Sequence, residues 1–290
     1  MTVLRRHSDL FLAAAAIIAA ASLLGAGAPP LPLLLAAVLL LGLPHGALDL
    51  WIAGRAGAGA RGWLRFHLGY LGIAGVVVST FLLVPVAATA AFLAFSVWHF
   101  ADDWRGSPAC LAQPHRIALA SAVVLAPLAF HPSETLALLA EVAAREPPAW
   151  PGTALRAIAL AVPLVAVLAA LRSHRRAGAE GLAVIALACT LPPLGFFASY
   201  FVLLHGPRHV LRHAPSLPAG AGPRAALYAG VAIALVLVLG SALGAGAATE
   251  GLAVRSIFVG LAALSVPHAL LVEVARGHDA APARLAEARA

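Results

Sequence analysis

Residues 31–51 read LPLLLAAVLLLGLPHGALDLW, an apolar run that ends in the polar motif Pro44-His45-Gly46-Ala47-Leu48-Asp49. About 20 apolar residues in a helix are enough to cross the hydrocarbon core of a bilayer. Three further motifs lie near the ends of apolar runs: Trp98-His99-Phe100, His205-Gly206-Pro207-Arg208-His209 and Pro267-His268. An imidazole is costly to hold in hydrocarbon without a partner, so five placed alike indicate a shared one, most simply a metal ion.

The composition of the whole chain indicates a membrane protein. Of its 290 residues, 62% are hydrophobic and 11% are charged, and apolar runs recur from end to end. We therefore expect one integral membrane domain over 1–290, because the longest stretch without a strong apolar run, roughly 131–153, is too short for an independent core. The net charge of +7 comes from short arginine clusters between apolar runs, which indicates membrane topology rather than nucleic-acid binding. Cys110 and Cys189 form no motif.

The apolar runs predict an all-α, polytopic transmembrane bundle of eight to ten helices. The pair of runs that meets at Leu191-Pro192-Pro193-Leu194 could instead form one kinked or re-entrant element. The alternation of leucine with charged residues around Thr135–Val142 favours a helix at the membrane interface. The predicted segments are roughly 9–28, 31–51, 64–84, 86–101, 116–130, 154–171, 178–191, 194–212, 225–243 and 252–272.

The first apolar run allows two interpretations. Arg5 and Arg6, the run Leu10–Leu24 and the small residues that follow would fit a cleavable signal peptide. However, the next run begins almost at once at Leu31, after two prolines, which favours a tight turn between two spanning helices.

The arginine-rich loops predict the orientation. They alternate with loops that are nearly free of lysine and arginine, so both termini are expected in the cytoplasm of a cell whose inner (plasma) membrane holds the chain. The five motif histidines, His45, His99, His205, His209 and His268, then lie within one or two turns of the cytoplasmic helix ends. Helix packing would bring them to one depth, as a common metal site requires.

Each motif offers candidate ligands and candidate supporting carboxylates. His205 and His209 are four residues apart, which places both on one helix face, although Pro207 between them predicts a kink or a new first turn. Asp49 follows His45 by four residues and could orient its imidazole. Asp102 and Asp103 after His99, and Glu273 after His268, are weaker candidates for the same role.

Each motif also has an alternative without a metal. His99 could belong to an aromatic belt at the interface, and Asp102 and Asp103 could form a solvated helix end. His268 is only a possible ligand, since Glu273 is a poorer geometric match. The other histidines lie in loops or near charged residues and are expected in solvent: His7, His67, His115, His131, His174, His213 and His278.

The ordered set of motifs resembles the Brp/Blh family of membrane carotenoid oxygenases. The resemblance rests on Pro-His-Gly-Ala-x-Asp from Pro44, Ser96-x-x-His99-Phe100, His205-x-x-Arg208-His209 and Pro267-His268-x-Leu270-Leu271-x-Glu273. It implies iron, Fe(II), held by His45, His99, His205 and His209. It also implies cleavage of β-carotene by O2 at the central double bond into two retinals, often for a microbial rhodopsin. Ala101, where a glycine is expected, and Gly206-Pro207 depart from the family pattern and put substrate and rate in doubt.

The chemistry of the residues agrees with that resemblance. Neutral imidazoles suit Fe(II) and leave coordination positions for dioxygen. A carotene has no polar handle, dissolves in membrane lipid and could reach the site between helices. Candidates to line its path, with ordinary helix packing as the alternative, are Phe92, Phe95, Trp98, Phe196, Phe197, Tyr200 and Phe201.

Two other classes of protein remain open at this point. A membrane di-iron hydroxylase or desaturase also places histidines at helix ends, but usually in several clustered boxes, and here only 205–209 qualifies. A non-enzymatic bis-histidine haem carrier or a transporter is the second alternative; a transporter would more often carry ionisable residues near mid-membrane.

Overall fold

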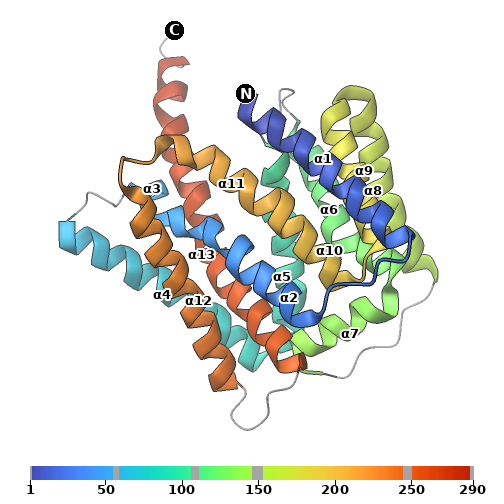
Figure 1. Cartoon of the computed structure of the whole chain (residues 1–290). Coiled ribbons are helices and arrows are strands. Elements are labelled where there is room, and N and C mark those ends of the chain that lie inside the picture. Colours follow the sequence, from blue (N-terminus) through green and yellow to red (C-terminus); the bar gives the residue numbers. More distant parts are fainter. Residues whose placement is uncertain (1, 55–58, 106–110, 146–152, 244–249, 288–290) are drawn as a thin grey trace.

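The structure, a computed structural model, describes residues 2–54, 59–105, 111–145, 153–243 and 250–287 (Figure 1). Within these ranges the chain forms helices and no strand, so the predicted all-α class is confirmed. The α-helices are α1 (Thr2–Leu23), α2 (Leu31–Ala37), α3 (Asp49–Ile52), α4 (Gly59–Leu83), α5 (Pro85–Phe100), α6 (Gln113–Phe130), α7 (Pro132–Ala143), α8 (Thr153–Ser173), α9 (Arg175–Thr190), α10 (Pro193–Tyr200), α11 (Gly206–His213), α12 (Ala221–Leu243) and α13 (Glu250–Glu287). Tighter or wider turns join some of them: η1 (Val38–Gly42), η2 (Leu43–Leu48), η3 (Ala101–Trp104), η4 (Phe201–His205) and η5 (Ala214–Ser216).

All ten predicted apolar segments are largely helical, but fewer of them qualify as spans. In the described part of the chain, six helices are long and apolar enough to cross a membrane, or seven if the α6–α7 pair, bent by 113°, is one broken span. The predicted count of eight to ten spans is therefore not confirmed. The helix expected around Thr135–Val142 is present as α7, which packs against α5 and α13.

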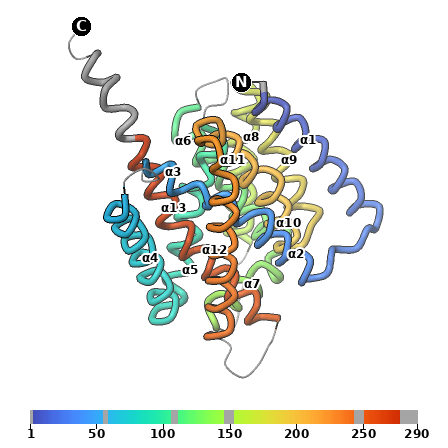
Figure 2. Tube along the Cα trace, turned by 60° about the vertical axis from the view of Figure 1, so that its left-hand side comes forward, coloured from blue at the N-terminus to red at the C-terminus, as the bar shows by residue number. Residues whose placement is uncertain are grey.

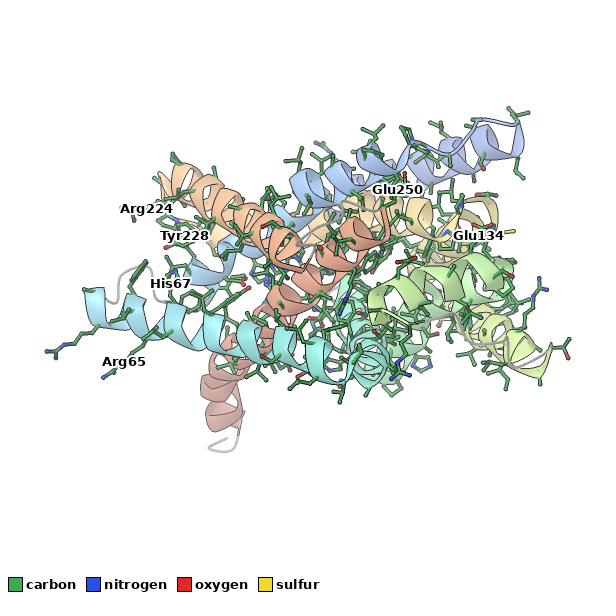
Figure 3. All side chains as sticks on the ribbon, turned by 90° about the horizontal axis from the view of Figure 1, so that it is seen from below. Arg65, His67, Glu134, Arg224, Tyr228 and Glu250 are labelled. Carbon is green, nitrogen blue, oxygen red and sulfur yellow. The ribbon has the colours of Figure 1, made fainter. Side chains whose placement is uncertain are left out.

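The outer helices expose apolar side chains, as lipid contact requires. α4 lies on one flank of the bundle and α1, α8 and α9 lie on the other (Figures 1 and 2). Only 6% of the apolar window of α4 and of α12 is buried, against 56% for α13. Figure 3 shows α4 and α12 from below, with Arg65 and Arg224 near corresponding ends of the two helices. α13 is thus the central helix against which α4 and α12 pack.

One face of the N-terminal helix packs into the core of the bundle. Phe11 and Ala15 of α1 are buried in a cluster with α6 and α9, which includes Leu119 and Leu187. Ala120, Ala122 and Ala126 of α6 are fully buried, and such small side chains let helix backbones approach closely.

Two broken helices cross in the middle of the molecule and carry three of the motif histidines. The first runs α2–η1–η2–α3 and the second runs α10–η4–α11. The first follows Pro30, the second begins at Pro193, and each contains a five-residue π turn, η1 or η4. Gly42 and Gly206 lie where they cross. A methyl group on Gly42 would overlap the ring of Phe201, and one on Gly206 would lie in van der Waals contact, 3.5 Å from the Gly42 carbonyl oxygen. Glycine at position 42 is what allows this close approach.

Candidate metal centre

The five motif histidines form one buried cluster. His45 comes from η2, His99 from the last turn of α5, His205 from η4, His209 from α11 and His268 from α13. Their exposed fractions lie between 1% for His268 and 8% for His209. The ring centroids of His45 lie 4.9 Å from those of His205, 5.5 Å from His209 and 5.2 Å from His268. His99 closes the cluster at 4.9 Å from His205 and 5.5 Å from His268.

The possible ligand atoms fall into two groups. The first group contains one nitrogen atom from each of three rings, and these atoms lie within 4.8 Å of one another: His45, His99 and His205. The same limit holds for atoms of Asp49, His209 and His268. These spacings are compatible with one or two metal ions.

Hydrogen bonds to the Nδ1 atoms leave Nε2 available in three of these rings. His45 Nδ1 lies 2.5 Å from the carbonyl oxygen of Gly42, His205 Nδ1 lies 3.2 Å from both carboxylate oxygens of Asp103, and His268 Nδ1 lies 2.6 Å from Asp49 Oδ1. When Nδ1 donates its proton, Nε2 of a neutral imidazole carries a lone pair. This is the arrangement that supporting carboxylates and carbonyls impose on metal-binding histidines.

Four of the Nε2 atoms have no partner among the described residues. Those of His99, His205, His209 and His268 are buried and make no hydrogen bond there. An unpaired buried polar atom costs free energy, and four of them on one cluster need a common explanation. The residues present therefore fit a bound transition-metal ion.

Asp49 supports a different histidine from the one that we expected. We predicted that it orients His45, but its Oδ1 accepts from His268, while Tyr70 donates to its Oδ2 at 2.9 Å. The reason lies in η2, which is a 3-10 helix rather than an α-helix. Residues four apart in a 3-10 helix differ by about 120° around the axis instead of lying on one face. Asp49 is thereby turned towards α13.

Asp103 has the corresponding place on the other side of the cluster. It is 3% exposed, and its carboxylate lies beside His205 and accepts a hydrogen bond from Tyr200 at 2.5 Å. Burial opposes ionisation of this group, but His205 and the guanidinium groups of Arg208 and Arg212 outweigh it and lower the pKa of Asp103 to about 2. Tyr200, expected to line the substrate path, is instead fully buried with its hydroxyl on this carboxylate.

A buried ion pair anchors the helix that carries His209. Arg208 donates to both carboxylate oxygens of Glu180 on α9, at 3.1 and 2.6 Å, and to the Asp103 carbonyl at 2.8 Å. Ser8 of α1 donates to the same Glu180 at 2.6 Å. Sequence reasoning missed Glu180 and Ser8; the only signal was a lone glutamate near an otherwise apolar run.

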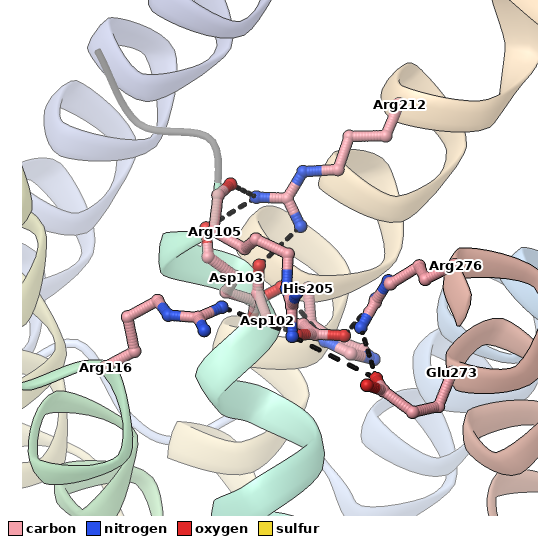
Figure 4. Close-up of polar contacts among 8 residues, drawn as sticks. All are labelled: Asp102, Asp103, Arg105, Arg116, His205, Arg212, Glu273 and Arg276. Carbon is pink, nitrogen blue, oxygen red and sulfur yellow. Dashed lines mark hydrogen bonds and ion pairs between the residues drawn. The ribbon is translucent and has the colours of Figure 1, made fainter. Parts of the chain in front are cut away.

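Asp102 and Glu273 do not contact the histidines. Asp102 pairs with Arg105, Arg116 and Arg276, and Glu273 pairs with Arg276 at 2.8 Å (Figure 4). Five residues along an α-helix correspond to a rotation of about 140° beyond a full turn, so Glu273 leaves the face of His268. The structure therefore pairs both carboxylates with arginines and not with the histidines that we expected them to support.

These ion pairs surround a polar cavity of about 270 Å³, here called the polar vestibule. It reaches His99, His205, His209 and His268 at one end. Residues from α1, η3, α11 and α13 line the rest: Leu4, Asp102, Asp103, Arg105, Arg212, His213, Val272 and Arg276. His213, expected in solvent, is half-buried there, with its ring 4.5 Å from that of His209.

An apolar cavity of about 120 Å³, here called the phenylalanine cavity, reaches His99 from the other side. Five of the seven expected substrate-lining residues lie on its wall: Phe92, Phe95, Phe196, Phe197 and Phe201. Trp98 and Tyr200 are outside its described lining. Trp98 adjoins His99 in the sequence, and neighbours in an α-helix point about 100° apart.

A second apolar cavity of about 120 Å³ lies between α4, α12 and α13 and is called the α4–α12 cavity. His45, Asp49, Tyr70 and His268 form its inner end. His67, expected in solvent, lines it and is half-buried. His7 is also half-buried, with Nε2 3.0 Å from the Leu203 carbonyl, whereas His115 is exposed and the side chain of His278 lies outside the described residues.

Comparisons with known proteins agree with this architecture. The family model for β-carotene 15,15'-dioxygenase matches residues 36–275. A curated β-carotene 15,15'-dioxygenase from an uncultured marine bacterium, 66A03, is 30% identical, over 82% of this chain and 91% of that protein. No solved structure matches the chain. The match includes all five clustered histidines, and the chain belongs to the β-carotene 15,15'-dioxygenase family of carotenoid cleavage dioxygenases.

Proposed function

We propose that this protein cleaves β-carotene at its central double bond with O2, giving two molecules of all-trans-retinal at an Fe(II) centre. The residues that would hold the iron are His45, His99, His205 and His209, with His268 as a possible fifth ligand. The observation that carries the proposal is the convergence of these buried rings, four of which have unpartnered Nε2 atoms among the described residues. The name of the family and of its relative supports the substrate.

The donor set suits the proposed ion. Uncharged imidazole nitrogens bind Fe(II) well, and a site without thiolates or many carboxylates is compatible with it. Bound iron would supply the redox chemistry that lets dioxygen react with a carbon–carbon double bond. Asp49 and Asp103 would fix the tautomers and orientations of His268 and His205.

The protein's own contribution to the reaction is placement of the polyene and exclusion of water. A polyene offers many similar double bonds, so only its position in the cavity can select one. Phe92, Phe95 and Phe196 supply an apolar wall that leads to His99, and the described residues that line that cavity include no charged side chain. Such a wall binds hydrocarbon and keeps water from the reacting bond.

A di-iron hydroxylase remains the second candidate, because two groups of ligand atoms are present. We favour Asp49 as a hydrogen-bond acceptor instead of a ligand, because both of its oxygens already face donors, His268 and Tyr70. Metal counting decides the stoichiometry. Two ions per chain together with hydroxylated carotenoid of intact length would favour the hydroxylase.

The decisive experiment is expression in cells that accumulate β-carotene. We expect loss of colour and retinal as the sole aldehyde, two per carotene consumed. A mixture of apocarotenals of many lengths would contradict central cleavage. The same preparation, purified, should contain iron and show no Soret band, which a bis-histidine haem would give.

The proposed orientation places both termini and the polar vestibule in the cytoplasm of a cell with the chain in its inner membrane, where retinal could supply a microbial rhodopsin. Arg105, Arg212 and Arg276 from three separate elements meet at that vestibule, which supports a common side for them. Reporters fused after Arg176 and Arg276 should report the cytoplasm, and one near Gly246 the outer side. A cytoplasmic Gly246 would contradict this orientation.

A further inference from the structure

Cleavage of a symmetric polyene at its centre sets a requirement on the cavity. Both halves of the molecule are identical, so equal lengths must extend from the reacting bond in two directions. A single dead-end pocket that reaches the histidines could hold only one half. The phenylalanine cavity reaches the cluster at His99, and its lining includes neither His45 nor His268.

The α4–α12 cavity reaches the same cluster from another direction. Its inner end is formed by His45 and His268, and its lining shares only Leu261 and Ser265 of α13 with the phenylalanine cavity. Nitrogen atoms of His45 and His99 lie within 4.8 Å of each other, so both cavities end at one small group of rings. Beyond the histidines and Asp49, the wall is mainly apolar, with Leu50, Leu71 and Leu235 among its residues.

The outer end of the α4–α12 cavity lies between the two most exposed spans. α4 and α12 each pack against α13, and His67 and Tyr228 face each other from the two helices (Figure 3). Their rings stack at 5.6 Å, and Trp63 donates to the Tyr228 hydroxyl at 3.0 Å. The side chains of Trp63, His67 and Tyr228 therefore bridge α4 and α12 at this mouth. The same face exposes Leu68, Leu227 and Val231.

The volumes indicate that the walls must move to admit a substrate. Each cavity measures about 120 Å³, whereas pockets for drug-sized ligands usually measure about 300 Å³ or more. α4 and α12 have few buried residues and can move apart at a smaller cost than the central helices.

We propose that the α4–α12 cavity is the second substrate arm: it holds one half of the polyene, which passes from the bilayer between α4 and α12, while the phenylalanine cavity holds the other half. This inference rests on the proposed cleavage of β-carotene. It assigns substrate contacts to Ala232, Leu235 and Tyr228. Leu261 and Ser265, which line both cavities, then lie where the two arms meet and help to position the double bond that is cleaved.

The test fills this arm and leaves the other open. Ala232→Trp places an indole in the α4–α12 cavity, and Leu237→Trp, on the exposed face of the same helix, is the matched control. For Ala232→Trp we expect β-carotene cleavage to fall about 10- to 100-fold because the central bond no longer reaches its position. An apocarotenal that keeps one ring and the central bond but has lost most of the other half should still be cut. Iron per chain should stay unchanged in both variants.

Binding provides a readout that does not depend on cleavage. Carotenoid retained by the purified, iron-free protein, followed by visible absorbance, should decrease in Ala232→Trp and not in Leu237→Trp. If the wild type binds carotenoid in this manner but gives no retinal, the proposed function fails while the arm stands. Equal losses on both substrates, or full β-carotene activity in Ala232→Trp, would overturn the arm. Should Ala232→Trp not fold, Leu235→Phe fills the same cavity with less volume, and the same outcomes apply.

Discussion

Two tyrosine–aspartate–histidine arrangements support different histidines of the cluster, and they differ in their surroundings. Tyr200, Asp103 and His205 lie beside Arg208 and Arg212, next to the polar vestibule. Tyr70, Asp49 and His268 lie at the inner end of an apolar cavity, and Asp49 is held by two hydrogen bonds and has no arginine ion pair among the described residues. The chemistry at the histidine is the same in both. The comparison indicates that one side holds its carboxylate by charge and the other by neutral hydrogen bonds.

The largest effects should come from the histidines themselves, and they test whether the two sides are equivalent. We expect His205→Ala to remove most of the proposed iron and abolish retinal formation, as should alanine at His45, His99 or His209, and we expect His268→Ala, at the possible fifth ligand, to lower both. Iron per chain by elemental analysis and retinal by chromatography provide the measurements. Exposed His115→Ala is the control. Full iron binding in His268→Ala would reduce the centre to the four other rings.

Removal of Glu180 tests how much the buried ion pair beside Asp103 and His205 contributes to the free energy of unfolding. Glu180→Ala leaves Arg208 buried without its carboxylate, and breaking a buried ion pair of this kind costs about 3–5 kcal/mol. Unfolding in mixed detergent micelles should show this loss. Asp9→Ala, which breaks the exposed pair with Arg176, is the control and should cost about 1 kcal/mol or less. Similar losses in both variants would mean that Glu180 does not anchor the charged side.

Substitution of either supporting carboxylate should weaken iron binding less than removal of a histidine does, and the loss should be larger at Asp103 than at Asp49. Asp49→Asn and Asp103→Asn each keep the shape of the side chain, and loss of such a supporting group usually lowers metal affinity or rate about 10- to 100-fold. We expect Asp103→Asn at the upper end, because it also removes a negative charge beside two buried guanidinium groups. Competition with a chelator measures the iron affinity. A larger loss in Asp49→Asn would reverse the comparison.

The tyrosines should give the smallest change. Tyr70→Phe and Tyr200→Phe each remove one hydrogen bond to a carboxylate, worth about 1.5–3 kcal/mol at most for a bond to a charged group. Only the part transmitted to the histidine should appear in iron affinity, so we expect a change of a few fold. The same chelator competition measures it. An unchanged affinity in both would limit the tyrosines to holding the helices together.

The sequence predicts the components of this site better than their connections. Apolar runs locate all ten helical segments, because a helix that crosses a bilayer needs a long apolar stretch. Their position at the ends of those runs identifies the five clustered histidines, because an imidazole in or near hydrocarbon is costly and therefore rare. The hydrogen bond between His268 and Asp49 joins residues 219 apart, and the one between Ser8 and Glu180 joins residues 172 apart. Neither pair is visible without the fold.

Local geometry accounts for the other differences between expectation and structure. A regular α-helix would place Asp49 on the face of His45, and the 3-10 turn at Leu43–Leu48 changes its direction. Trp98 lies outside the described lining of the phenylalanine cavity, because neighbouring residues of a helix differ by a rotation of about 100°. Tyr70 was missed because it lies in the middle of a long apolar helix.

The π turns at Val38–Gly42 and Phe201–His205 make the site depend on helical phase. A π turn bonds residue i to i+5, one residue further along than an α turn. Every residue after it is therefore rotated by about 100° relative to an uninterrupted α-helix. Removing one leucine from Val38–Gly42 would leave the hydropathy profile almost unchanged and the residues of the Pro44–Asp49 motif intact. It would nevertheless turn His45 away from the other four rings. Two homologues with the same motifs and the same hydropathy profile could thus differ in whether they can assemble the centre at all, and the residue count of these two short turns would distinguish them.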